Sequence, residues 1–123
     1  MSIMELQHIN IRCADVESSR RFYECLGLAV GSRPPFTSRG YWLYAGTIPV
    51  VHLVQRPNGE AVAGPGTGNL DHVAFEGKDL ASTRRMLNSQ GITFREALVP
   101  RDGVTQLFVA DPDGITLELN FAP

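Results

Sequence analysis

The sequence predicts an α+β fold in which one β-α-β-β-β unit occurs twice in tandem within a single domain of 123 residues. Two observations lead to this prediction: an internal repeat, and a hydrophobic pattern that changes from strand to helical spacing and back in each copy. We place the first module at about residues 4–56, a linker at about 57–68 and the second module at about 69–121.

The repeat is found by sliding the chain along itself. A shift of 64 positions superposes residues 6–8 on residues 70–72 without a gap. Towards the end of each copy the shift becomes 66, so that His52 falls on Glu118. A two-residue difference in one connecting loop accounts for the change. The chain therefore repeats one supersecondary unit.

Each copy opens with a strand and continues into a helix. Apolar side chains alternate over residues 6–12 and 70–76, as in a half-buried strand. Asp15 and Asp79 follow as expected N-caps, because a carboxylate accepts hydrogen bonds from the free N–H groups of the first helical turn. The helices are expected to end near glycines, which adopt the left-handed conformation of a helix stop. These glycines are Gly27 and Gly91.

Three short strands complete each copy, separated by residues that favour turns. The expected strands are 29–32, 41–45 and 50–55 in the first copy, and 93–98, 105–110 and 116–121 in the second.

The composition excludes several classes of function. Apolar residues make up 43% of the chain and charged residues 20%, which is typical of a folded domain. A net charge of −2, with scattered basic residues, disfavours nucleic-acid and membrane partners. We find neither a secretory signal nor an apolar run of the roughly 20 residues that a spanning helix needs. We therefore expect a cytoplasmic protein in which Cys13 and Cys25 are reduced.

Strand alternation places His8 on the sheet face that points away from the helix. Side chains two apart share a face, so His8 lies with Asn10 and Arg12. Ile9 and Ile11 then point to the opposite face, which the helix of the unit covers.

Three further side chains follow the same alternation. His72 repeats the position of His8, while His52 and Glu118 occupy matching positions in the last strands of the two copies. A single strand histidine is more often a hydrogen-bonded structural residue than a ligand, but the common register of all four side chains favours a metal site. Imidazole and carboxylate ligands without thiolate suit zinc, nickel, manganese or iron. The predicted ligands are His8, His52, His72 and Glu118.

Polar side chains near the ligands form the expected substrate-binding set. Asn10, Arg12 and Asn120 share the ligand face by alternation, and Gln106 joins them from the adjacent strand. Arg101 stands in a Pro-Arg-Asp-Gly turn, from which its guanidinium would meet an anionic group of the substrate. Exposure to solvent is the alternative for Arg101.

Several segments carry motifs of a known family: LQHINI, WLYAG with VVHL, LDHVAF and DPDGITLEL. They resemble the glyoxalase/bleomycin-resistance/extradiol-dioxygenase superfamily, also called vicinal oxygen chelate proteins, over nearly the whole chain. The resemblance implies two βαβββ modules whose eight strands form a curled mixed sheet around a metal-containing cavity, with the helices outside, and it implies a homodimer. His8, His72 and Glu118 match the family's recurring ligands, whereas His52 falls where glyoxalase I has a glutamate.

The resemblance further implies a divalent-metal-dependent lyase or isomerase of glyoxalase type. Its substrate would be a small carbonyl compound or thiol adduct that chelates the metal through two vicinal oxygens. Glu118 is the expected catalytic base, with purely structural ligation as the alternative. An extradiol-type dioxygenase stays open, although the additional His52 and the short chain count against it. A ligand-sequestering resistance protein without metal and a fosfomycin-type thiol transferase are also open.

Overall fold

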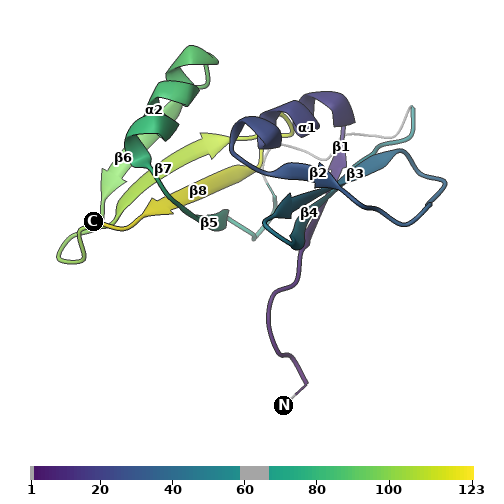
Figure 1. Ribbon diagram of the computed structural model, residues 1–123, viewed down its shortest axis with the longest axis horizontal. Coiled ribbons are helices and arrows are strands. Elements are labelled where there is room, and N and C mark those ends of the chain that lie inside the picture. The colour runs from purple at the N-terminus through teal and green to yellow at the C-terminus, as the bar shows by residue number, and fades with distance from the viewer. Residues whose placement is uncertain (1, 59–66) are drawn as a thin grey trace. The chain divides into compact units, whose positions relative to one another are not determined.

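The structure is a computed structural model that describes residues 2–58 and 67–123, and the chain divides into two compact units, Met1–Val62 and Ala63–Pro123. In its described residues, each unit contains one helix and four strands in the order β-α-β-β-β (Figure 1). The predicted α+β class and repeated module are therefore confirmed. Most of the predicted linker, residues 57–68, lies outside the described residues.

The first unit has a mixed sheet with the strand order β1-β4-β3-β2. Strand β1 (Ile9–Cys13) runs parallel to β4 (Ile48–Gln55), while β3 (Gly40–Ala45) is antiparallel both to β4 and to β2 (Ala29–Gly31). Helix α1 (Val16–Cys25) covers one face of this sheet and contacts β2, β3 and β4. The opposite face is the open face of the first unit.

Hydrogen bonds tie α1 to the strand beneath it. The Tyr41 hydroxyl donates to Glu17 Oε1 at 2.5 Å, and Glu17 also accepts from Arg20 at 3.0 Å and Arg39 at 2.9 Å. The Tyr41 hydrogen bond, followed by the two arginines, lowers the pKa of Glu17 from its ordinary 4.5 to about 2 although partial burial opposes the shift. Because Tyr41 points to α1, its neighbour Trp42 points to the open face.

The second unit repeats this topology with the strand order β5-β8-β7-β6. Strand β5 (Val73–Gly77) is parallel to β8 (Thr116–Phe121), and β7 (Thr105–Ala110) is antiparallel both to β8 and to β6 (Phe94–Leu98). Helix α2 (Leu80–Ser89) packs Leu87 into the core of this unit. The sheet face away from α2 is the open face of the second unit.

Both helices begin and end at the predicted residues. Asp15 accepts from the N–H groups of Glu17 and Ser18 at the start of α1, and Asp79 accepts from Ser82 at the start of α2. Asp79 does so with a φ of 61°, a left-handed conformation that aspartate tolerates better than most residues. Gly27 and Gly91 follow the helices with φ of 107° and 68°.

Both opening strands start later than predicted. We expected them to begin at residues 6 and 70, whereas pairing with β4 and β8 begins three residues further on. Among the described residues, the ladders with β4 and β8 begin at Ile9 opposite Val51 and at Val73 opposite Leu117. As a result, His8 and His72 stand on the segments that lead into the strands and not within them.

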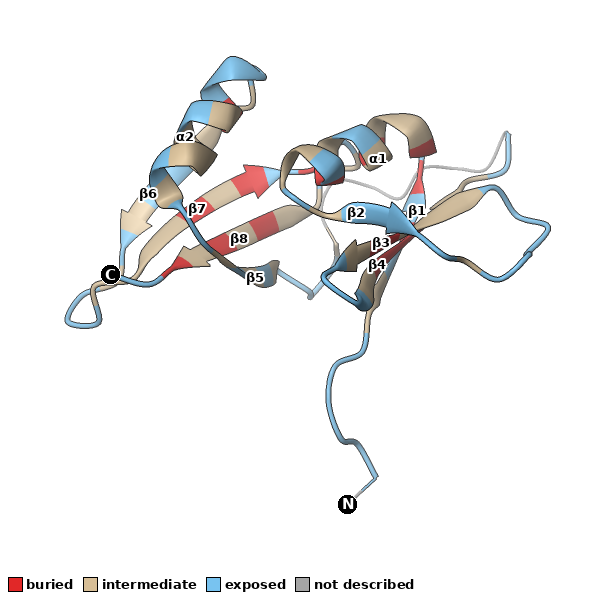
Figure 2. Ribbon diagram, viewed as in Figure 1, coloured by how far each residue is buried: buried red, intermediate tan, exposed pale blue. Residues whose placement is uncertain are grey.

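The predicted alternation of faces is confirmed in β8. Leu117, Leu119 and Phe121 are buried, while Glu118 and Asn120 between them are half-buried. Figure 2 shows this alternation as bands of different colour along the strand. The core of the second unit therefore lies on the α2 side of the sheet, and the polar side chains of β8 stand on the open face.

Two further expectations concern the cysteines and membranes. Cys13 is buried and its thiol donates to the Ile11 carbonyl at 3.5 Å, while Cys25 is half-buried. No helix in the described residues is long and apolar enough to cross a membrane.

Candidate functional site

The structure brings the four predicted ligands together in two pairs, one in each unit. His8 lies against His52, and His72 faces Glu118. Among residues 2–58 and 67–123, no three histidine, cysteine, aspartate or glutamate side chains gather in a single cluster of the kind that holds a metal. Each unit therefore carries half of the predicted ligand set.

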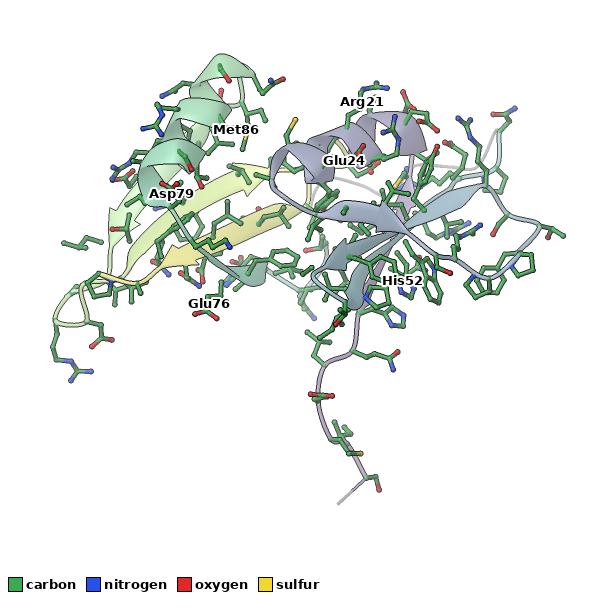
Figure 3. The ribbon with its side chains drawn as sticks, viewed as in Figure 1. Arg21, Glu24, His52, Glu76, Asp79 and Met86 are labelled. Carbon is green, nitrogen blue, oxygen red and sulfur yellow. The ribbon has the colours of Figure 1, made fainter. Side chains whose placement is uncertain are left out.

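In the first unit the histidine pair belongs to a column of three aromatic rings. The His52 ring lies between those of His8 and Trp42, with ring centroids 3.8 and 4.0 Å apart and interplanar angles of 15° and 9°. His52 and Trp42 are direct partners across β4 and β3, and Phe36 lies 6.3 Å from Trp42 in a tilted arrangement. Figure 3 shows His52 on the side of the sheet away from α1. We call His8, His52 and Trp42 the aromatic column.

His8 and His72 are oriented in the same way by the residue before each of them. His8 Nδ1 lies 3.0 Å from Gln7 Oε1, and His72 Nδ1 lies 2.8 Å from Asp71 Oδ2. Both oxygens accept, so each histidine donates from Nδ1 and, in the neutral ring, keeps a lone pair on Nε2. Histidines that bind metals commonly donate their second N–H to such an acceptor.

His52 is held with the opposite tautomer. Its Nε2 donates to the Pro49 carbonyl at 3.1 Å, which leaves the lone pair on Nδ1. The residue is only 7% exposed. Burial lowers the pKa of His52, and the neighbouring His8 adds to this shift. Both effects favour the neutral ring, the form that a metal ligand requires.

In the second unit the ligand pair continues into a chain of amide side chains. His72 Nε2 lies 3.5 Å from Glu118 Oε1. Asn120 donates to Glu118 Oε2 at 2.9 Å, and Gln106 donates to Asn120 Oδ1 at 3.2 Å. The hydrogen bond to Asp71, and then the charge of Glu118, raise the pKa of His72. One carboxylate oxygen is thus fixed by an amide, and the other faces the histidine.

The donor set of this pair fits a divalent metal. Two ligand atoms that each lie about 2.1 Å from one ion, at an angle of about 110°, are about 3.4 Å apart. The observed separation of His72 Nε2 and Glu118 Oε1 is 3.5 Å. Imidazole nitrogen and carboxylate oxygen are ligands that zinc, nickel, manganese and iron accept.

Four of the five predicted substrate-binding residues lie on the open faces. Asn10 is exposed and pairs directly with His52, and Arg12 is exposed two residues further along β1. Asn120 and Gln106 form the amide chain of the second unit. Figure 3 shows Glu76, the strand partner of Asn120, on the side away from α2.

Arg101 is the exception. Its side chain is 90% exposed and pairs with Asp102 at 3.2 Å. Its φ of 73° belongs to a tight turn in which Gly103 donates to the Val99 carbonyl. The structure therefore supports the alternative of exposure to solvent for this residue.

Sequence reasoning missed Arg95 of β6. Its guanidinium carbon lies 4.1 Å from the centre of the Phe108 ring, and Phe108 is the strand partner of Glu118. Alternation along β6 was available as a signal, because Glu96 next to it pairs with Arg84 of α2. The alignment of Arg95 with Phe108 could not be read from the sequence, because it depends on the register between two strands.

These features define a class of protein built from two βαβββ modules. In each module one histidine stands just before the first strand, and a histidine or a glutamate stands in the last strand. The chain belongs to the Glyoxalase/Bleomycin resistance protein/Dioxygenase superfamily, whose family model matches residues 5–119. The resemblance inferred from the sequence motifs is confirmed. The superfamily name includes glyoxalases and dioxygenases, so an enzymatic role accords with membership.

Individual relatives agree with this assignment. Glyoxylase I 4 of Arabidopsis thaliana is 30% identical over 125 residues, a match that covers 97% of this chain and 71% of the plant protein. A glyoxalase family protein from Enterococcus faecalis has 27% identity and a TM-score of 0.70, with 98% of this chain and 99% of that chain covered. A glyoxalase/dioxygenase from Nostoc punctiforme shares the fold, with 17% identity, a TM-score of 0.78 and coverage of 99% and 93%.

Proposed function

We propose that this protein is a divalent-metal-dependent lyase or isomerase of glyoxalase type, acting on a small carbonyl compound or thiol adduct that presents two vicinal oxygens. The observation that supports this most is the His72–Glu118 pair, whose free donor atoms are 3.5 Å apart while Asp71 and Asn120 hold their outer atoms. The similarity to Glyoxylase I 4 favours glyoxalase chemistry over ring cleavage. A cytoplasmic homodimer is part of the proposal.

In this proposal the residues that would hold zinc, nickel, manganese or iron are His8 and His52 of the first unit and His72 and Glu118 of the second. When bound, such an ion supplies Lewis-acid stabilisation of the negative charge that develops on the substrate oxygens. His8 and His72 offer Nε2 and His52 offers Nδ1, as their hydrogen bonds to Gln7, Asp71 and Pro49 dictate.

Glu118 is the proposed base that moves a proton between substrate carbons. Because Asn120 holds Oε2, Oε1 would be the oxygen that loosens from the metal to accept the proton and return it. Gln106 in turn holds the Asn120 carbonyl oxygen and keeps its amide group directed to Glu118. The amide chain therefore orients the carboxylate without neutralising it.

A second candidate function is sequestration of a ligand without catalysis. The aromatic column supports it, because stacked rings on an open sheet face suit planar ligands. In this reading the histidines are stacking residues and the amide chain of the second unit is structural.

Metal analysis and turnover distinguish the two candidates. We expect protein purified without chelator to hold about one ion per chain, and His72→Ala and Glu118→Ala to reduce the metal content at least about tenfold. Glu24→Gln, which removes a carboxylate from α1, is the matched control and should keep the metal. Hemithioacetal isomerisation is then assayed with each of the four ions.

Two outcomes count against the proposal. Metal content unchanged by both substitutions would overturn the ligand assignment. Metal bound as expected, without turnover for any of the ions, would remove the glyoxalase reaction and favour sequestration.

A further inference from the structure

Arg95 places a positive charge on the open face of the second unit, beside the ligand pair. Strand register aligns Arg95 with Phe108, and Phe108 with Glu118. The guanidinium carbon lies 4.1 Å from the Phe108 ring centre. Neighbouring strands are about 4.8 Å apart. The guanidinium lies over the Phe108 ring of β7, so it is about one strand spacing from β8, the strand that carries Glu118.

The charge of Arg95 has no carboxylate partner within residues 2–58 and 67–123. Arg84 on the opposite side of the same sheet differs, because it donates to both oxygens of Glu96 at 2.8 and 2.6 Å. Arg95 is exposed, and its one described interaction is with the Phe108 ring. Its hydrogen-bond donors are therefore available to a ligand.

The fold does not require a side chain at this position. Gly31 is the equivalent residue of the first unit, since it pairs with Trp42 as Arg95 pairs with Phe108. A Cβ on Gly31 would lie 2.6 Å from the Tyr44 ring, so the position is closed to side chains there. The repeated sheet therefore forms without a side chain at the position of Arg95.

The contact with Phe108 suits Arg95 to bind an anion. An aromatic ring beneath a guanidinium limits the motion of a long side chain and leaves the in-plane fork of N–H groups free. That fork matches the two oxygens of a carboxylate. One guanidinium balances the single charge of a carboxylate, which favours this group over a doubly charged phosphate.

We propose that Arg95 binds a carboxylate of the substrate and selects for acidic substrates over neutral ones. The inference rests on the proposed function for the place of the reacting oxygens beside Glu118. The substrate class is then a small acid whose carboxylate is separated by a few bonds from its vicinal oxygens. Arg95 is a specificity-determining residue, and it takes no part in proton transfer.

Two thiols of similar size test the selection. The methylglyoxal adduct of 3-mercaptopropionate carries a carboxylate, and that of 2-mercaptoethanol is neutral. We expect Arg95→Gln to raise KM for the acidic adduct about tenfold, with kcat and both constants for the neutral adduct nearly unchanged. Arg95→Lys should restore part of the loss. Arg85→Gln, which removes an exposed cation from α2, is the control and should behave as the parent protein.

A second measurement needs no turnover, so it separates this inference from the proposed reaction. The Arg95 Nε–H resonance of the metal-free protein is followed by NMR while 3-mercaptopropionate or 2-mercaptoethanol is added. A saturable shift with the acid alone supports the carboxylate site even if no reaction is found. A shift with both thiols, or with neither, overturns it. The same spectra show whether each variant is folded.

Discussion

The two units share strand order and, around His52 and Glu118, the same register, yet their open faces carry different side chains. In the first unit His52 is nearly buried within the aromatic column, and burial lowers its pKa. In the second unit the Asn120 amide holds Glu118, and an exposed cation lies on the neighbouring Phe108. The pKa of His72 is raised by its acidic neighbours.

This difference comes from three pairs of equivalent positions. His52 corresponds to Glu118, Trp42 to Phe108, and Gly31 to Arg95. The repeated backbone determines where these side chains stand, and their identity determines what they do. The first face carries a stack of aromatic rings, whereas the second carries a carboxylate held by an amide, next to a cation on an aromatic ring. We therefore expect His52 to contribute both to stability and to metal binding, whereas Glu118 and Arg95 should act on chemistry with little effect on stability.

The largest expected effect is on turnover in the second unit. Glu118→Gln keeps a side chain that can accept from Asn120 but removes the negative charge. We expect kcat for hemithioacetal isomerisation to fall about 10³-fold, the usual contribution of a general base, with a nearly unchanged melting temperature. Activity within a few-fold of the parent would show that Glu118 is not the base, and Glu24→Gln is the control.

Two substitutions of His52 separate stacking from ligation in the first unit. His52→Ala empties a buried position between two rings and should lower the free energy of unfolding by about 2–3 kcal/mol. His52→Phe keeps the stack and should stay within about 1 kcal/mol of the parent while losing metal. Chemical denaturation and elemental analysis measure both quantities. Full metal content in the phenylalanine variant would exclude His52 as a ligand.

Equivalent positions in β2 and β6 should differ in their tolerance of change. Gly31→Ala brings a Cβ to within 2.6 Å of the Tyr44 ring, so we expect a loss of about 1–2 kcal/mol in the free energy of unfolding. Arg95→Ala changes an exposed side chain and should cost about 0.5 kcal/mol or less. Equal losses at the two sites would contradict the view that Arg95 is not needed for the fold.

The smallest expected effect is a pH-dependent contribution of Glu17 to the stability of the protein. The pKa of Glu17 is lowered from 4.5 to about 2, so its ionised form is favoured by folding. Its stabilising contribution is complete above about pH 5 and is lost as the pH falls towards 2. We therefore expect the difference in melting temperature between the parent protein and Glu17→Gln, measured by thermal denaturation, to become smaller as the pH falls through this range.

The second unit provides the comparison for this measurement. Glu96, whose pKa is lowered mainly by Arg84, should show a weaker form of the same dependence in Glu96→Gln. If the difference in melting temperature between the parent protein and Glu17→Gln did not change with pH, the charge of Glu17 would not contribute to stability.

The sequence by itself determined the elements, the caps and the faces. Alternation in β8 places Glu118 on the face opposite Leu117 and Leu119, and this can be predicted without knowing the partner strand. Asp15 and Asp79 mark the starts of the two helices because they cap them through local hydrogen bonds. These features depend on residues close together in the chain, where spacing and capping chemistry act directly.

Only the tertiary structure decided which side chains meet. It placed Arg95 on Phe108 and set His52 between His8 and Trp42. It also turned Arg101 out to solvent. Alternation tells which face a residue occupies, but its neighbours on that face depend on the register between strands. Pairing between residues distant in the chain, together with the loops that join the strands, sets that register.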